Sequence, residues 1–305
     1  MGWPLRMYAP EGIYFITCRT FQARLLMRPS SQVNELIGGV LARSVERFGV
    51  EVFAFVFLSN HFHLLVRARA GTHASFMQYL LSNLSKKVGR LVDWKGSFWG
   101  RRYSAEPVLD DAALVGRMKY ILSHGVKERL VDKCADWPGL SCLPFLTGIA
   151  SRAYRWFNWT RRWNKRRTVG GDGALLSDSW AETHVLRLSP LPCWERLAEA
   201  TRLALVRCLV QDIEAEHATA GARPPGPASV EAQAPHAVPR SVARSPRPLA
   251  HTTVRELLLE YTQTYRAFVA AFRDASRRWR RGDFETRFPP FAFHPPLLES
   301  AVRLH

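Results

Sequence analysis

The apolar run from Glu51 to Val66 constrains the fold of this chain more than any other segment. Sixteen residues exceed the usual length of one strand, and Ser59-Asn60 in the middle is a turn signal. The run therefore predicts a β-hairpin whose second strand begins at His61. Side chains two residues apart on a strand share a face, so His61 and His63 would project together and Phe62 the other way. Two neutral imidazoles side by side form half of a divalent-metal site, although a His-x-His pair also arises by chance.

The segments around this hairpin predict an α+β domain. The expected elements are a strand over 13–19, a helix from Ser31 to about Phe48, the hairpin, a helix from Ser75 to about Val92, a strand over 105–109 and a helix from Asp111 to Gly125. This order favours an antiparallel sheet with helices packed on one face.

The third of these helices carries the residues that would complete a site. At about 100° per residue, its apolar side chains fall in one stripe about 120° wide. They are Leu114, Val115, Met118, Ile121 and Leu122. Tyr120 lies about 200° from the centre of that stripe, and His124 lies beside it one turn later. Arg117 and Lys127 share this polar side. Tyr120 is therefore either an exposed surface tyrosine or a functional one flanked by bases and a possible ligand.

The charge of the whole chain points to a polyanionic partner. Lys and Arg number 43 against 26 Asp and Glu, a net charge of +17. The segment from Arg152 to Arg167 contains seven bases and no acid, interleaved with tryptophan and tyrosine. Nucleobases stack on aromatic side chains. The interleaving of aromatic and basic residues therefore favours nucleic acid as the partner over a membrane surface, and over a solvated basic face with no partner.

Composition divides the chain into four parts. Residues 1–148 hold the predicted α+β domain, and 149–217 form a basic, aromatic extension that we expect to be largely helical. Residues 218–250 are rich in Pro and Ala and predict a disordered linker. Residues 251–305 predict an amphipathic basic helix, about 252–281, and a tail.

Cysteine usage and hydropathy predict a cytoplasmic protein with no membrane partner. The five cysteines are scattered and include no Cys-x-x-Cys pair. The first residues lack an apolar signal core, and no run reaches transmembrane length.

Several of these motifs together resemble the single-tyrosine HUH transposases, and most closely the REP-associated tyrosine transposases. The resemblance covers about residues 10–145. The segments that carry it are Thr17-Cys18-Arg19, Leu58-Ser-Asn-His-Phe-His-Leu-Leu-Val66, Phe98-Trp99, Arg101-Arg102-Tyr103 and Tyr120-Ile-Leu-Ser-His-Gly-Val-Lys-Glu-Arg-Leu-Val131. It implies a ferredoxin-like HUH catalytic domain over residues 1–148.

The resemblance also implies an activity. Tyr120 would attack a phosphodiester of single-stranded, hairpin-bearing DNA and form a 5′-phosphotyrosine, releasing a 3′-OH that can later rejoin the strand. His61, His63 and His124 would hold one Mg²⁺ or Mn²⁺ ion. We expect a monomer or a homodimer. The expected DNA contacts are Trp99, Arg101, Arg102, Arg117, Lys127, Arg161, Arg162, Arg166 and Arg167.

One position departs from the family pattern. Members commonly carry Asn or Gln four residues after the tyrosine, often followed by proline, whereas this chain has His124 and Gly125. Histidine is a competent ligand for Mn²⁺. The departure also leaves open a non-catalytic, domesticated HUH fold that binds nucleic acid and regulates. A metal-dependent phosphoesterase that uses activated water is a further alternative. A helicase-type initiator is disfavoured, since no P-loop motif occurs.

Overall fold

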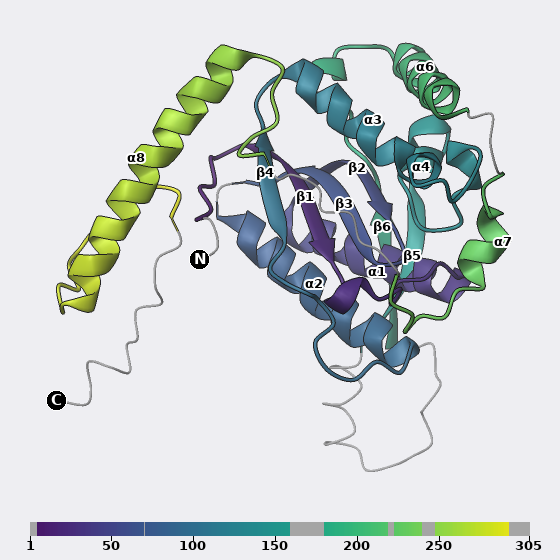
Figure 1. The fold of residues 1–305 in the computed structure, drawn as a ribbon, viewed down its shortest axis with the longest axis horizontal. Helices are drawn as coiled ribbons and strands as arrows, with labels where there is room; N and C mark the ends of the chain where they lie inside the picture. Colours follow the sequence, from purple (N-terminus) through teal and green to yellow (C-terminus); the bar gives the residue numbers. More distant parts are fainter. Residues whose placement is uncertain (1–4, 70, 159–179, 219–222, 240–247, 293–305) are drawn as a thin grey trace.

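The computed structural model describes residues 5–69, 71–158, 180–218, 223–239 and 248–292. Its centre is a four-stranded antiparallel sheet in the order β2-β3-β1-β4 (Figure 1). The strands are β1 (Ile13–Arg19), β2 (Glu51–Phe57), β3 (His61–Arg67) and β4 (Ser104–Val108). The predicted hairpin is confirmed: β2 and β3 are joined by residues 58–60, and β3 begins at His61.

Three long helices belong to this sheet, and each begins close to its predicted start. They are α1 (Ser31–Phe48), α2 (Thr72–Leu91) and α3 (Asp111–Lys127). The side chain of Ser30 accepts a hydrogen bond from the Val33 amide at the start of α1, and Gly49 ends that helix at a φ of 61°. The element order β-α-β-β-α-β with this strand order is the ferredoxin-like arrangement, and the predicted α+β class with an antiparallel sheet is confirmed.

The helices divide between the two faces of the sheet, so the prediction that they pack on one face is wrong. In β1, the Tyr14 ring contacts His73 of α2 at a centroid distance of 5.0 Å, whereas the Phe15 ring contacts Tyr120 of α3 at 5.7 Å. Because consecutive strand residues point to opposite faces, α2 and α3 cover opposite sides. The last turns of α3, from Ile121 to Val126, are buried on all sides, because they lie between the sheet and α6 (Glu199–His217).

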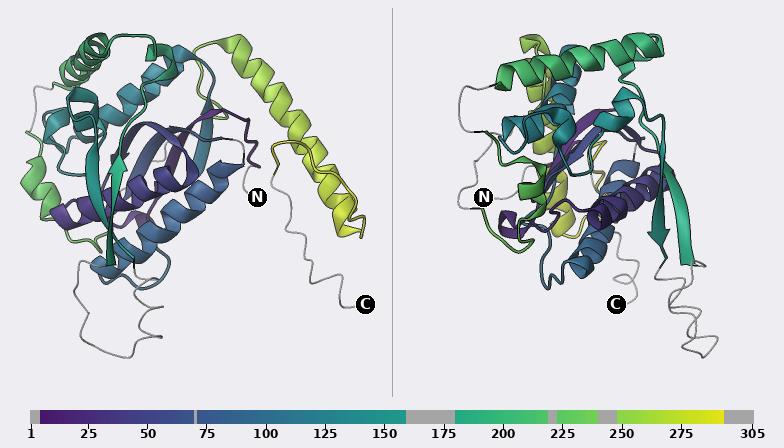
Figure 2. Two further views of the ribbon diagram at one scale, coloured as in Figure 1. Left: turned by 180° about the vertical axis from the view of Figure 1, so that it is seen from behind. Right: turned by 90° about the vertical axis from the view of Figure 1, so that its right-hand side faces the viewer.

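The extension after residue 148 begins with strands, not with the helix that we predicted. Strands β5 (Arg152–Phe157) and β6 (Ala181–Leu186) form an antiparallel hairpin against α1 (Figure 2). The physical reason is a two-residue period: Tyr154 and Trp156 are buried on α1, while Ala153 and Arg155 are exposed. These two aromatic side chains, which we expected to stack on bases, are therefore part of the core.

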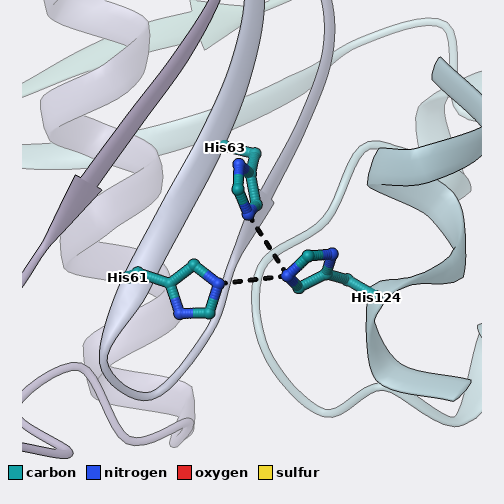
Figure 3. A group of neighbouring side chains, drawn as sticks. All are labelled: His61, His63 and His124. Carbon is teal, nitrogen blue, oxygen red and sulfur yellow. Dashed lines mark hydrogen bonds between the residues drawn. The ribbon is translucent and has the colours of Figure 1, made fainter. Parts of the chain in front are cut away.

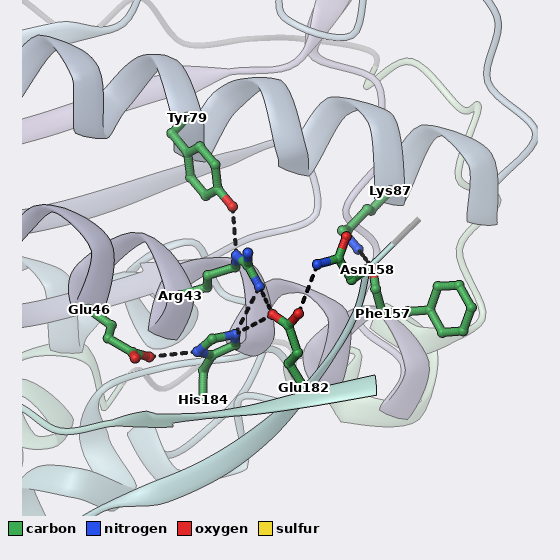
Figure 4. A network of polar contacts seen from close by, with 8 residues as sticks. All are labelled: Arg43, Glu46, Tyr79, Lys87, Phe157, Asn158, Glu182 and His184. Atoms are coloured by element: carbon green, nitrogen blue, oxygen red, sulfur yellow. Dashed lines mark hydrogen bonds and ion pairs between the residues drawn. The ribbon is translucent and has the colours of Figure 1, made fainter. Parts of the chain in front are cut away.

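A polar network connects this hairpin to helices α1 and α2 (Figure 4). Arg43 of α1 forms an ion pair with Glu182 of β6, and its Nε donates to the Tyr79 hydroxyl of α2 at 2.8 Å. Lys87 of α2 donates to the Phe157 carbonyl at 2.8 Å and lies 3.7 Å from the centre of the Trp156 ring. Burial lowers the pKa of Lys87 to about 8. The hairpin is thus tied to both helices by charge as well as by packing.

The remaining described elements surround the sheet. They are η1 (Phe21–Ala23), η2 (Cys134–Asp136), α4 (Leu143–Thr147), η4 (Pro192–Trp194), α6 (Glu199–His217), α7 (Gly226–Glu231) and α8 (Arg255–Arg280). Within the predicted linker, residues 223–239 contact the α+β domain: Val230 is fully buried, and the Leu25 amide donates to the Ala237 carbonyl at 3.2 Å. That part of the predicted disordered linker is therefore structured, because it has a surface to pack on. In the described part of the chain, no helix combines the length and apolarity that a bilayer span requires.

The close approach of β5 to α1 depends on glycine, and this yields a stability prediction. A Cβ at Gly38 would overlap the Tyr154 ring, whereas a Cβ at Gly116 of α3 would meet nothing within 4 Å. We expect Gly38→Ala to destabilise the protein by about 1–3 kcal/mol through overpacking. Gly116→Ala is the matched control and should stabilise by about 0.5–1 kcal/mol through helix propensity. Urea unfolding midpoints measure both, and equal shifts in the two variants would contradict this account of the hairpin.

Candidate functional site

Three buried histidines meet between the sheet and α3 (Figure 3). His61 Nε2 lies 3.0 Å from His124 Nε2, and His63 Nε2 lies 3.2 Å from the same atom. A neutral imidazole nitrogen can donate or accept one linear hydrogen bond, so His124 Nε2 cannot satisfy both neighbours. Nitrogens bound at about 2.1 Å to one cation, at right angles, stand about 3.0 Å apart. The three residues therefore fit a shared metal ion.

Neighbouring side chains orient two of the three histidines, His61 and His63. The Nδ1 atom of His61 is 2.6 Å from Asn60 Oδ1, and the Nδ1 atom of His63 is 2.8 Å from Thr17 Oγ1. Such outer partners orient metal-binding histidines and select the tautomer with a free Nε2 lone pair. Burial holds the pKa of His61 and His63 well below the usual value and lowers that of His124 to about 4. The imidazoles are thus neutral near pH 7, the state that binds metal.

Tyr120 stands next to this triad on α3, one turn before His124. Its ring centroid is 4.9 Å from that of His124 and 5.4 Å from that of His63. The Phe15 ring is stacked on His63 at 5.0 Å and meets Tyr120 edge-on at 5.7 Å, so it holds the two rings in place. Tyr120, which the helical wheel places away from the apolar stripe, is half-buried and faces the histidines.

Taken together, the surroundings of Tyr120 raise the pKa of its hydroxyl. Burial raises the pKa of its hydroxyl, the charge of Glu128 raises it further, and Arg117 and Arg19 lower it. Lys127 Nζ lies 4.4 Å from the centre of the Tyr120 ring, and the Arg117 guanidinium carbon lies 5.0 Å from it. Burial therefore outweighs the effect of the two arginines, and the pKa of Tyr120 lies above its ordinary value.

The other residues predicted to contact DNA lie in an exposed loop, on the opposite face of β3 or outside the described residues. Arg101 and Arg102 are exposed, and the loop that carries them runs beside the end of β1, where the Gly100 amide donates to the Arg19 carbonyl at 3.0 Å. Trp99 packs edge-on against Phe62, on the face of β3 opposite the histidines, and its indole N–H donates to the Leu81 carbonyl at 3.0 Å. Arg161, Arg162, Arg166 and Arg167 lie outside the described residues.

Sequence reasoning did not assign roles to several residues around the triad. Thr17 is opposite His63 in the β1–β3 register, and Asn60 was interpreted only as a turn residue. The charge of Arg19 lowers the pKa of all three histidines. His251 arrives from far along the chain, where its ring meets Phe15 at 5.3 Å and its Nε2 is 2.8 Å from Glu106 Oε2. Only the turn residue had a local signal, since the others depend on strand register or on long-range contact.

Comparison with protein families agrees with this geometry. Residues 18–124, about a third of the chain, match the model of the IS200-like transposase family. The matched segment runs from β1 to His124, so it contains the hairpin, Tyr120 and the three histidines. These residues are thus similar to the IS200-like transposase family, in agreement with the resemblance predicted from the sequence.

Individual relatives are similar over less than half of the chain. A Haemophilus influenzae protein named as a REP-associated tyrosine transposase is 24% identical over 144 residues, which are 44% of this chain and 81% of the relative. A solved structure of a REP-associated tyrosine transposase bound to a REP hairpin aligns with 47% of this chain and 84% of its own, at 18% identity and a TM-score of 0.41. A crystal structure of a Deinococcus radiodurans protein described as a transposase aligns with 40% of this chain and 95% of its own, at 18% identity and a TM-score of 0.29.

The hydrogen bond between Thr17 and His63 yields a prediction about metal affinity. In Thr17→Val, His63 Nδ1 loses its outer partner while the shape of the side chain is kept. We expect Mn²⁺ to bind about 10–100-fold more weakly, the usual effect of removing such a partner. Thr147→Val removes a hydroxyl that donates to the Leu143 carbonyl within α4, and should leave the affinity unchanged. Titration calorimetry of both variants measures this, and equal affinities would contradict the role of Thr17.

Proposed function

We propose that this protein is a metal-dependent DNA strand transferase of the REP-associated transposase type. It cleaves single-stranded DNA that bears a hairpin and rejoins it through a 5′-phosphotyrosine on Tyr120. The observation that carries the proposal is the position of Tyr120 one helical turn from His124, with its ring 5.4 Å from His63. A nucleophile and a cation site beside each other are what phosphodiester exchange requires.

His61, His63 and His124 would hold the cation in this proposal. A bound divalent ion supplies a positive charge that orients the scissile phosphate and neutralises charge on its oxygens. Three imidazole donors suit Mn²⁺ and other transition metals better than Mg²⁺, which prefers oxygen ligands. Of the two ions expected from the sequence, the donor set therefore favours Mn²⁺.

The chemistry then rests on residues of α3 and β1. The Tyr120 hydroxyl loses its proton to solvent and its oxygen attacks the phosphorus, while the bond from phosphorus to the 3′-oxygen breaks and that oxygen takes up a proton. Arg117 and Arg19 stabilise the phenolate, since both charges lower the pKa of Tyr120. Attack by a 3′-OH on the phosphotyrosine reverses the step, joins the strand and restores the tyrosine.

The experiment that tests this proposal is covalent capture. Purified protein is incubated with end-labelled, hairpin-bearing single-stranded DNA and Mn²⁺ or Mg²⁺, and separated on a denaturing gel. We expect an adduct with the wild-type protein that disappears in Tyr120→Phe and on chelation of the metal. Tyr261→Phe, a half-buried tyrosine of α8, is the matched control and should form the adduct at the wild-type level.

Other outcomes identify the alternatives. Tight DNA binding without an adduct in any metal would support the non-catalytic regulator, and His124→Asn, which restores a ligand common in the family, would then be tested for recovery of activity. Cleavage without an adduct that persists in Tyr120→Phe would support a phosphoesterase using activated water.

The raised pKa of Tyr120 predicts the pH dependence of the reaction. Since burial raises the pKa above its ordinary value of 10.0, the phenolate fraction grows throughout the range below pH 10. We expect the rate of adduct formation under single-turnover conditions to rise with pH without a plateau in that range. In Arg117→Gln the pKa should rise further, so that the rate at pH 8 falls about 10–100-fold. A rate that is independent of pH would show that deprotonation of Tyr120 does not limit the step.

A further inference from the structure

Helix α8 lies outside the transposase domain and is mostly exposed (Figures 1 and 2). Only Phe268 and Ala275 of its 26 residues are buried. Its aromatic side chains form a stacked row along one side, Tyr261–Tyr265–Phe268–Phe272, with centroids 6.3 Å apart at each step. The row ends against Phe288, which contacts Phe272 at 5.3 Å. The aromatic side of the helix is therefore partly occupied by the chain itself.

A separate side of α8 carries a line of arginines, which we call the arginine ridge. With Tyr265 at 0° and about 100° per residue, the ridge residues fall between about 60° and 120°. They are Arg255, Arg266, Arg273, Arg277 and Arg280, and all five are exposed. At about 1.5 Å per residue the ridge is about 37 Å long.

The acids of α8 lie away from this ridge. On the same wheel Glu256 and Asp274 fall at about 180° and Glu260 at about 220°. Within the ridge, Arg277 is paired with Asp274 at 3.1 Å, while no ion pair is found for Arg266, Arg273 or Arg280 with any described residue. Arg278 falls at about 220°, on the side of the acids, and it is paired with Asp283 at 2.8 Å. The five ridge arginines are therefore separated from the acids of α8 by helical phase and form a linear surface that is complementary to a polyanion.

The base of α8 is fastened to the transposase domain. His251 forms a parallel bridge with Val108 of β4, its amide donating to the Pro107 carbonyl at 2.8 Å. The carboxylate of Asp110, which caps α3, also accepts from the Thr252 hydroxyl at 2.5 Å and from the Thr253 amide at 2.7 Å. The start of α8 is therefore held at the first turn of the helix that carries Tyr120.

The middle of α8 is also close to the loop with the predicted DNA contacts. The Tyr265 hydroxyl donates to the Leu5 carbonyl at 2.9 Å, and the neighbouring Arg6 guanidinium lies 3.5 Å from the centre of the Tyr103 ring. Burial raises the pKa of Tyr265, and the charges of Arg102 and Arg273 lower it. One residue of the ridge and one of the predicted DNA contacts therefore act on the same tyrosine of α8.

We propose that the arginine ridge of α8 binds the phosphate backbone of DNA and holds it beside the transposase domain. The proposal rests on the proposed function for the identity of the substrate, and adds a binding surface outside the family domain. A line of guanidinium groups about 37 Å long can contact phosphates along roughly one turn of a duplex. Such contacts add affinity without sequence selectivity and weaken as salt rises, because they release condensed counterions.

The test compares two double variants with equal changes in net charge. Arg266→Gln/Arg273→Gln removes two ridge charges and keeps residues of similar helix propensity. Arg187→Gln/Arg207→Gln removes two exposed arginines away from α8. Binding of a fluorescent hairpin oligonucleotide is measured by anisotropy in EDTA over a series of NaCl concentrations, so that cleavage does not contribute. Circular dichroism verifies that helix content is retained.

We expect the ridge variant to bind the oligonucleotide roughly tenfold or more weakly at low salt. Its plot of log affinity against log salt should be less steep by about 1.4–1.8, the loss of two phosphate contacts. The control variant should keep the wild-type slope. Equal slopes in the two variants would overturn the proposal. So would a ridge variant that binds DNA normally but no longer sediments with phosphatidylserine vesicles, a result that would assign the ridge to a membrane surface.

Covalent capture at saturating DNA separates this proposal from the proposed function. An adduct at the wild-type level in the ridge variant, with the weaker binding described above, supports both. If the wild-type protein forms no adduct but the difference in salt slope remains, the proposed chemistry fails and the binding surface stands. If the adduct forms and the slopes are equal, the chemistry stands and the binding surface fails.

Discussion

The register between β1 and β3 is the constraint on which the rest of this structure depends. It places Thr17 opposite His63 and Arg19 opposite His61. A slip of one residue would turn both histidines to the α2 face and bring Phe62 into the site. Because β3 lies between β1 and β2 and Phe62, Leu64 and Val66 are fully buried, such a slip would place two polar imidazoles where these apolar side chains now pack. Core packing and site geometry are thus enforced by the same pairing.

Helix α3 packs on the face of the sheet to which this register turns the histidines. Its first turn is capped by Asp110, which is also bound to Thr252 and Thr253, and its last turns are enclosed by the sheet and by α6. A helix restrained at both ends presents Tyr120 and His124 in a definite orientation, as exchange at phosphorus requires. The same burial raises the pKa of Tyr120, the proposed nucleophile, so the charges around it matter more than they would on an open surface.

Much of the domain was predictable because its signals are local. The turn at Ser59-Asn60, the start of α3 at Asp111 and the phase of Tyr120 against His124 all depend on residues close together in the sequence, and each is found as expected. The β5–β6 hairpin was not predicted correctly. The alternation of Tyr154 and Trp156 with exposed residues is a local sign of a strand, but their burial depends on glycines of α1 that are more than a hundred residues away in the sequence.

The sequence alone determined the hairpin, the pair of histidines on one face, the helix that carries Tyr120 and His124, and the excess of positive charge. These follow from periodicity, turn chemistry and composition, which act between near neighbours. Tertiary structure decided that α3 crosses the histidine face, that Thr17 orients His63, and that His251 and Thr252 tie α8 to the site. It decided these because strand register and helix docking are set by burial of distant apolar surfaces against one another.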